Sequence, residues 1–395
     1  MTKRLAIPSK ELQLQVVGPR DVFLASRVQR LTFNTDIPVT DVDELGNPLH
    51  VGQVKDTPNI TLTFSAFDVG IKIFAALTGQ NPDAYPGAGV DISDLGEIDS
   101  ILYVKDPDVA TYVKSGHGRR LQIRDFTFTY NVDGESTEDY TAIGSEKRWL
   151  KYDVVVDKFV SGTTSFTLSE TPIALNNGNL ALSVVLDGKY LAEVTGTPGT
   201  GEYKISGTTL TTGDSRTSQC LAVYHSNASS AWADVSDTVQ PAAIRGKDVD
   251  VKILANEIDR VQSVTINGNL NPTVVKEMGT RNIIGYQRQV STVDGNITVL
   301  DTDIDLISLL TCGVIGSGSE WQPGEGCASV DISLTVELMD PCDTSVPYTI
   351  LKTVHIPKIT IVGDSYTANV NGNASQVFNF RSADAQCIIY SGAKP

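Results

Sequence analysis

The sequence predicts a mainly β protein that carries one module twice, with a small all-β domain inserted between the two copies. Two observations support this fold class: a long internal duplication, and short alternating strands separated by turns rich in Gly and Asn. After a shift of 233 positions, residues 27–79 align with residues 260–312 without a gap, and 14 of the 53 aligned pairs are identical. Random pairing would give roughly 3 identities. Such a duplication indicates two structural units of one kind.

Length and composition agree with a globular protein of several domains. The chain has 395 residues, of which 41% are hydrophobic and 20% charged, as is typical of folded domains. The net charge of −16 is spread along the chain, which argues against tight binding of nucleic acid; the alternative is that it serves only solubility. The N-terminus lacks the apolar core of a signal peptide, and the apolar stretches are too short to span a bilayer. We therefore expect no membrane partner.

The first copy of the module is expected at residues 27–150, after an N-terminal arm at residues 1–26. It begins with an alternating strand at residues 28–33. A long polar loop or extended hairpin follows from residue 36 to residue 47, and a second alternating strand covers residues 59–65.

A short helix follows in each copy and a hairpin closes it. Asp68 and Asp301 are expected to cap the two helices, and Gly79 to end the first. A strand containing Ile123 aligns with a strand of the second copy at an offset of 233, whereas the next turn, Asn131-Val-Asp-Gly, aligns at 238. This difference predicts a five-residue insertion in that turn.

The segment between the two copies has no counterpart elsewhere in the chain. Residues 155–240 contain short strands at close spacing with Gly and Asn turns, a pattern typical of a small all-β sandwich. Insertions of this size are tolerated on exposed loops, so we expect this domain on the outside of any assembly. The second copy is expected at residues 249–395.

The sequence predicts no enzyme, metal site or cofactor. The four histidines are far apart, without metal-ligand spacing, and no residues form a catalytic constellation. The cysteines are odd in number and lack a C-x-x-C pair: Cys220, Cys312, Cys327, Cys342 and Cys387. Buried free thiols are the favoured interpretation, and disulfides within an assembled particle are the alternative.

The order of these elements resembles the tail tube proteins of tailed bacteriophages. The resemblance rests on the strand that starts at Val28, the acidic Val-x-Glu-Leu-Gly stretch of residues 42–46, the strand at residues 59–65, and the Asp-x-x-Ile…Leu-Thr-Gly helix of residues 68–79. All four features recur in the second copy, which departs from the pattern where Cys312 replaces Gly. The resemblance covers about 250 of the 395 residues and leaves the inserted domain unexplained.

The resemblance implies a β-sandwich or half-barrel with a flanking helix, six of which form a ring. Two modules per chain then imply a trimeric, pseudo-sixfold ring, and stacked rings form the tail tube of a virion, assembled in the bacterial cytoplasm. Its acidic lumen would conduct DNA during ejection without specific binding. The implied partners are further copies of the chain, the tape measure, the tail tip or baseplate, the tail terminator and, in contractile tails, the sheath. Whether the tail contracts is left open.

The same resemblance places the contacts between subunits and rings in the long loop of each copy. The candidate contact residues are Asp36, Asp41, Asp43, Glu44, Leu45 and Gly46 in the first loop, and Asn271, Lys276, Glu277, Met278 and Arg281 in the second.

Two other classes of protein share some of these features. A secretion-system tube has a similar fold, but such subunits usually carry one module. A carbohydrate- or receptor-binding tandem β-domain protein, similar to an adhesin, also explains β-rich repeats. It predicts aromatic surface platforms, whereas aromatic residues make up only 7% of this chain.

Overall fold

Strands dominate the computed structural model, and the part of the chain that it describes contains one α-helix, which confirms the prediction of a mainly β fold. No helix in this part is long and apolar enough to cross a membrane. The described residues are 9, 12–45, 49–79, 89–105, 112–151, 153–160, 162, 164–227, 243–254, 256–279, 283–300, 332–343, 345, 347–368, 370 and 373–395.

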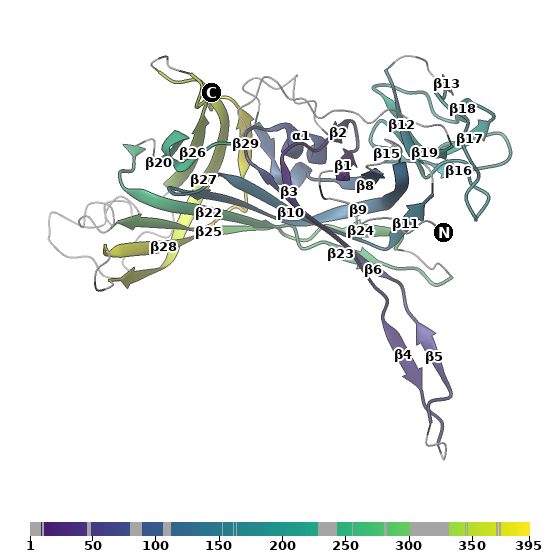
Figure 1. Cartoon of the computed structure of the whole chain (residues 1–395), viewed down its shortest axis with the longest axis horizontal. Helices are drawn as coiled ribbons and strands as arrows, with labels where there is room; N and C mark the ends of the chain where they lie inside the picture. The colour runs from purple at the N-terminus through teal and green to yellow at the C-terminus, as the bar shows by residue number, and fades with distance from the viewer. Residues whose placement is uncertain are drawn as a thin grey trace.

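The first module is a two-layered sandwich in which one long strand belongs to both layers (Figure 1). The first layer has the order β3 (Val28–Asp36), β6 (Asn59–Phe67), β10 (Thr137–Gly144) and the second half of β9 (Tyr112–Asn131). The second layer contains β1 (Leu12–Val17), β2 (Val22–Leu24), β8 (Glu97–Lys105), β11 (Glu146–Leu150) and the first half of β9. Alternating apolar residues of both layers fill the core between them.

The N-terminal arm predicted at residues 1–26 is wrong for residues 12–24, because they form β1 and β2 of the second layer. β1 runs antiparallel to β8, from Leu12 opposite Val104 to Val17 opposite Asp99. The loose alternation of apolar residues in this segment is that of a strand with one buried face. The module therefore begins about fifteen residues earlier than the duplication alone indicates.

The helix α1 (Lys72–Thr78) closes one end of the sandwich and is almost fully buried. Its N-cap is Ile71, which makes no side-chain capping bond, and it ends at Gly79, whose φ of 73° is the left-handed conformation favoured at such ends. The prediction that Asp68 caps this helix is therefore wrong. The equivalent cap, Asp301, lies outside the described residues.

The second module repeats the strand order of the first. Its strands are β20 (Val249–Ile253), β21 (Asn256–Glu257), β22 (Val261–Asn269), β25 (Thr292–Leu300), β26 (Ile332–Met339), β27 (Ile350–Thr367), β28 (Ser375–Ser382) and β29 (Ile388–Ser391). The first layer has the order β22, β25, β28 and the second half of β27, while β20, β21, β26, β29 and the first half of β27 form the second. The short strand β7 (Gly89–Asp91) of the first module adds to β29.

The register of the long strands corrects the predicted place of the insertion. Val104 of β8 pairs with Lys114 of β9, and the equivalent Leu338 of β26 pairs with Lys352 of β27. The offset is thus already 238 at the start of β27, so the extra residues lie in the loop before this strand and not in the turn after it. Ile123 and Thr127 of β9 also meet Ile356 and Thr360 of β27 at an offset of 233, which makes the shifted alignment look plausible.

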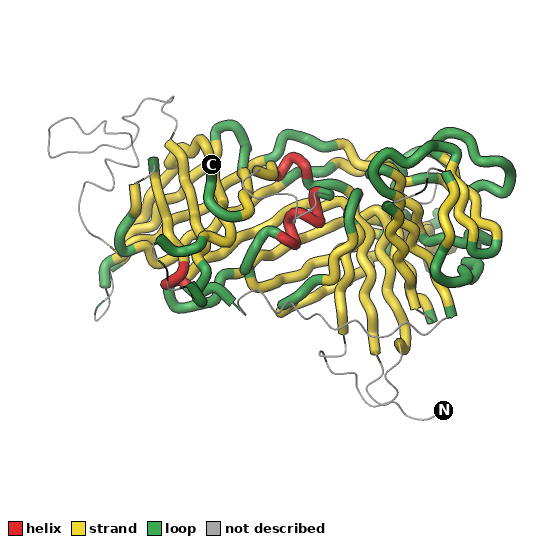
Figure 2. The backbone as a smooth tube through the Cα atoms, turned by 90° about the horizontal axis from the view of Figure 1, so that it is seen from above, coloured by secondary structure: helices red, strands yellow, loops and turns green. Residues whose placement is uncertain are grey.

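The inserted domain is a sandwich of two four-stranded sheets with its own core. One sheet has the order β12 (Asp153–Phe159), β19 (Cys220–Ser226), β14 (Ser183–Leu186) and β15 (Lys189–Tyr190); the other has β13 (Ser165–Thr167), β18 (Thr209–Thr212), β17 (Glu202–Ser206) and β16 (Ala192–Glu193). The first sheet packs on β1 and β8 through apolar residues that include Val17, Ile101 and Leu221. The second module, the first module and the insert therefore lie in a row (Figure 2).

Each module also carries a two-stranded hairpin between the first and second strands of its first layer. The first hairpin consists of β4 (Val39–Val42) and β5 (Gly52–Lys55), and the second of β23 (Thr273–Val275) and β24 (Gly285–Gln287). Short 3-10 turns occur at Ile92–Asp94 and Gly246–Asp248.

Candidate functional site: edges and hairpins of the two modules

The two modules are joined edge to edge inside the chain. β22 pairs antiparallel with the second half of β9, from Ser263 opposite Asn131 to Asn269 opposite Asp125. The two four-stranded layers thereby become one continuous sheet. At the centre of this joint, the Thr127 hydroxyl donates to the side-chain oxygen of Asn267 at 3.0 Å.

A buried ion cluster behind the sheet also links the modules. Lys352 of the second module is fully buried, and its ammonium lies 2.8 Å from Asp68 and 3.6 Å from Glu138 of the first module. Tyr130 donates to Asp68, and Tyr140 donates to Glu138. Burial would lower the pKa of Lys352, but the two carboxyls raise it, whereas burial, aided by Asp68, raises the pKa of Glu138 to about 8. One ammonium thus balances one carboxylate, and near neutral pH Glu138 is mostly protonated.

The joint pairs β22 with the second half of β9. The equivalent strands, β3 and the second half of β27, are the two outer strands of the continuous sheet, and their outer edges are open. Among the described residues, β3 pairs only with β6, and the second half of β27 pairs only with β28. By module equivalence, β3 corresponds to β22 and β27 corresponds to β9. The open edges carry a similar polar pair. Asn34 is equivalent to Asn267, and Ser365 is equivalent to Thr127. Asn34 and Ser365 are both exposed in the single chain.

The direction of the backbone groups on the open edge follows from the joint. The amide of Val132 donates to the carbonyl of Gln262 at 2.9 Å, and the amide of Leu270 donates to the carbonyl of Arg124 at 2.8 Å. The backbone N–H and C=O groups of every second residue of β22, starting at Gln262, therefore point toward β9. The equivalent residues of β3, whose backbone groups point to the open side, are Gln29, Leu31, Phe33 and Thr35. An edge of this kind is a template for another strand.

The first hairpin projects away from the module (Figure 1) and holds most of the contact residues predicted from the first loop. It exposes apolar side chains on both faces, including Val39 and Val54, the latter 60% exposed. His50 lies 2.5 Å from the Asp43 carboxylate, and Gln53 donates to Asp41 at 2.9 Å. Of the predicted residues, Asp36 ends β3, Asp41 lies in β4, Asp43, Glu44 and Leu45 are exposed beyond it, and Gly46 lies outside the described residues.

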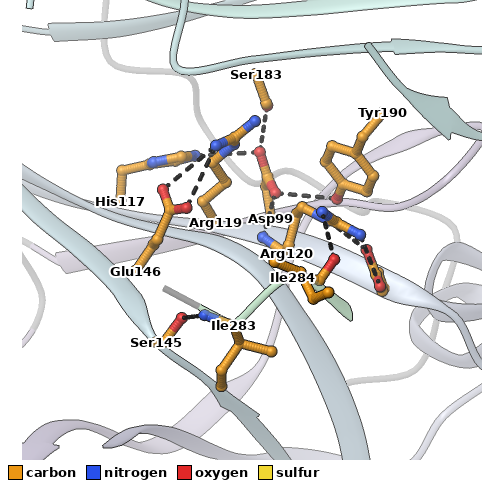
Figure 3. A network of polar contacts seen from close by, with 11 residues as sticks. Asp99, His117, Arg119, Arg120, Ser145, Glu146, Ser183, Tyr190, Ile283 and Ile284 are labelled. Atoms are coloured by element: carbon orange, nitrogen blue, oxygen red, sulfur yellow. Dashed lines mark hydrogen bonds and ion pairs between the residues drawn. The ribbon is translucent and has the colours of Figure 1, made fainter. Parts of the chain in front are cut away.

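The second hairpin does not project but lies on the first module. Arg120 donates to the carbonyl of Ile284 at 3.2 Å, and the amide of Ile283 donates to Ser145 at 3.0 Å (Figure 3). The Tyr286 hydroxyl donates to the carbonyl of Ile143 at 3.1 Å, and Arg288 donates to two carbonyls in the segment after β7. This docking was not predicted from the sequence.

The residues predicted from the second loop have different roles. Lys276 lies 3.7 Å from Asp56 at the base of the first hairpin, and the amide of Asn271 donates to the side chain of Asn269. Glu277 and Met278 are exposed, while Arg281 lies outside the described residues.

A polar cluster around Asp99 fixes the inserted domain to the same place (Figure 3). The buried Asp99 carboxylate accepts bonds from Ser183 and, at 3.0 Å, from the Tyr190 hydroxyl, both in the insert. It also contacts His117 at 3.2 Å and accepts the Arg120 amide at 2.8 Å. Burial alone would raise the pKa of Asp99, but the His117 contact and these hydrogen bonds lower it. Arg120 thus connects the insert, the first module and the second hairpin.

The uncovered face of the continuous sheet is polar and carries few charges. In both modules the residues that alternate with the core positions are mainly Thr, Ser and Asn. They include Thr61, Thr63, Ser65, Thr127, Thr129, Ser263, Thr265, Asn267, Asn296 and Thr298. The charged residues of this face are the carboxylates Asp36, Asp125, Asp139 and Asp294 and the arginines Arg30 and Arg381.

The described residues contain no group of His, Cys, Asp and Glu side chains suited to a metal ion. Their free cysteines are Cys220 and Cys387, both buried, and Cys342, which is exposed; Cys312 and Cys327 lie outside the described residues. The chain matches no protein-family model and no curated protein.

Lys352 and Asp99 were missed from the sequence. A signal existed for both, because each is a charged residue in a largely apolar stretch that forms a strand buried on both faces.

Proposed function

We propose that this protein is a structural subunit that assembles head to tail into rings, and that stacked rings form a tube like the tail tube of tailed bacteriophages. The observation that carries the proposal is the joint of β9 and β22 together with its two open equivalents. The edge of β3 and the edge of β27 differ in chemistry, so pairing them between chains gives a heterologous contact, which closes into a ring or continues as a filament.

The register of the contact between chains follows from the joint within the chain. Thr32 of one copy would lie opposite Thr367 of the next, and Asn34 opposite Ser365. The serine hydroxyl can donate to the Asn34 side chain, as Thr127 does to Asn267. With two modules per chain, closure after three chains gives six modules around the ring.

In such a ring the uncovered face of the sheet would line the lumen, because the other face is occupied by the second layer and the insert. The carboxylates of the uncovered face outnumber its two cations, Arg30 and Arg381, and Arg381 lies opposite Asp294, so this face offers no continuous cationic surface to phosphates. Weak repulsion without strong binding suits the passage of a polyanion. The proposed lumen is thus mostly neutral and only mildly acidic, although the whole chain carries −16.

The test is a proline in the open edge. Thr35→Pro removes an amide on the open side of β3, whereas the matched control Thr35→Val keeps it. We expect the parent protein and the control to give hollow rings or tubes by electron microscopy and a species of three chains by light scattering. The proline variant should be a folded monomer. Unchanged assembly of Thr35→Pro, or a parent protein that stays monomeric also with tail-tip proteins added, would contradict the proposal.

A further inference from the structure

The two hairpins have the same length but different surroundings. Each connects the first and second strands of its layer through 22 residues, 37–58 in the first module and 270–291 in the second. The second hairpin lies on the first module of the same chain, where it contacts Arg120, Ile143 and Ser145, while the first hairpin projects away from the modules (Figure 1). The second hairpin follows β22, which is paired at the joint, and the first hairpin follows β3, whose outer edge is open.

We infer that the first hairpin docks sideways onto the second module of the next copy in the same ring, as the second hairpin docks onto the first module within the chain. This inference rests on the proposed ring. It differs from the expectation that the long loop reaches the next ring, and it assigns the receiving surface to the middle of β27 and the C-terminal end of β28.

The receiving positions are defined by equivalence. Lys358 of β27 stands at the position of Arg120, which donates to the carbonyl of Ile284; the equivalent carbonyl in the first hairpin is that of Val51. A basic side chain able to donate to this carbonyl is therefore retained. Ala383 is equivalent to Ser145, and His50 is equivalent to Ile283. In the proposed contact, Ala383 would therefore lie opposite His50 of another copy.

Charge separates the two hairpins and their receiving surfaces. Residues 37–58 carry four acidic side chains and one basic, a net −3, whereas residues 270–291 carry one acidic and three basic, a net +2. The basic hairpin docks beside Glu97 and Glu146 of the first module, which are paired with Arg120 and Arg119 of that module, and its own Arg288 donates to backbone carbonyls. At the position of Ile143, the second module instead carries the exposed Arg381, which suits an acidic hairpin.

The apolar side chains of the first hairpin give a further reason for docking. Val51 and Val54 are 54% and 60% exposed, although an isolated two-stranded hairpin is at best marginally stable in water. A neighbouring module would cover one face, as the first module now contacts Ile283 of the second hairpin.

The test is crosslinking in assembled rings. The double variant His50→Cys with Ala383→Cys is made in a background in which Cys312, Cys327 and Cys342 are replaced by Ser, so that only the buried Cys220 and Cys387 remain, and is treated with a short bismaleimide. The result expected is covalent dimers and trimers on a denaturing gel, with no larger species, because lateral links close after three chains. The control pair, Ile283→Cys with Ser145→Cys, should crosslink within one chain, and each single variant should stay unlinked.

The outcomes separate the two proposals. Rings without a crosslink, or a ladder that continues beyond three chains, would overturn lateral docking and favour a contact between stacked rings. Absence of rings by electron microscopy would overturn the proposed function itself. Rings with covalent trimers as the largest product support both.

Discussion

Lys352 and Lys114 occupy equivalent positions in the two modules but have different environments. Lys352 is fully buried against two carboxyls of the first module, whereas Lys114 is exposed and lies 4.4 Å from the centre of the Trp149 ring. The same contrast holds for the whole interface, since β22 is paired while β3 is open. One chain thus shows equivalent module edges once paired and once open, and in the proposed ring the paired edges are the template for the open ones.

The largest expected effect comes from the buried lysine. Lys352→Met leaves Asp68 buried without its cation, so we expect a loss of about 3–5 kcal/mol in the free energy of unfolding. Lys114→Met should change this free energy by less than about 1 kcal/mol, because only an exposed contact with a ring is lost. Urea denaturation of both variants checks this pair.

A second substitution serves as the control for the first. If charge burial is the cause, adding Asp68→Asn to Lys352→Met should recover much of the loss. If Lys352→Met and Lys114→Met lowered the free energy of unfolding equally, the contrast between a buried Lys352 and an exposed Lys114 would be contradicted.

The next effect is a pH dependence that only the formed interface should show. Burial raises the pKa of Glu138 from its ordinary value of 4.5 to about 8, so between these values the folded state binds more protons than the unfolded state. The contribution of Glu138 to stability is therefore complete below about pH 4.5 and is lost as the pH rises through 8. Glu138→Gln should flatten the fall in stability between about pH 5 and pH 8, measured by denaturation at each pH. An unchanged slope would show that Glu138 titrates normally.

The smallest effect concerns the polar pairs of the two edges. Thr127→Val should destabilise the single chain by about 1 kcal/mol, because it removes the hydrogen bond to Asn267 and leaves that amide oxygen without this donor. Ser365→Ala should leave the single chain unchanged and weaken the association of chains by a similar amount, measured by sedimentation at several concentrations. A loss of stability in Ser365→Ala would contradict the assignment of this residue to an open edge.

The sequence was sufficient for the duplication and the strand content, and it left open whether the long segment after the first strand of each module is a loop or an extended hairpin. The strand register of β27 could not be predicted, because Ile123 and Thr127 of β9 meet an Ile and a Thr of β27 at the wrong offset, so that two alignments bury similar residue types. Asp68 was mistaken for a helix cap since capping depends on local sequence, whereas its actual partner, Lys352, lies 284 residues further along the chain. The docking of the second hairpin was equally hidden, because most of its bonds go to backbone carbonyls, which leave no trace in residue identity.

The most direct measurement is a disulfide across the proposed contact between chains. Asn267 and Thr127 are directly opposite, and residues opposite each other at such a position, where the backbone bonds point outward, have Cα atoms about 4.5 Å apart, within the range of a disulfide. Asn267→Cys with Thr127→Cys should therefore form a bond within one chain. The equivalent pair, Asn34→Cys with Ser365→Cys, should join chains and give a covalent trimer after oxidation. If the control pair closes while Asn34→Cys with Ser365→Cys stays monomeric in oxidised, assembled protein, β3 does not pair with β27 of another copy.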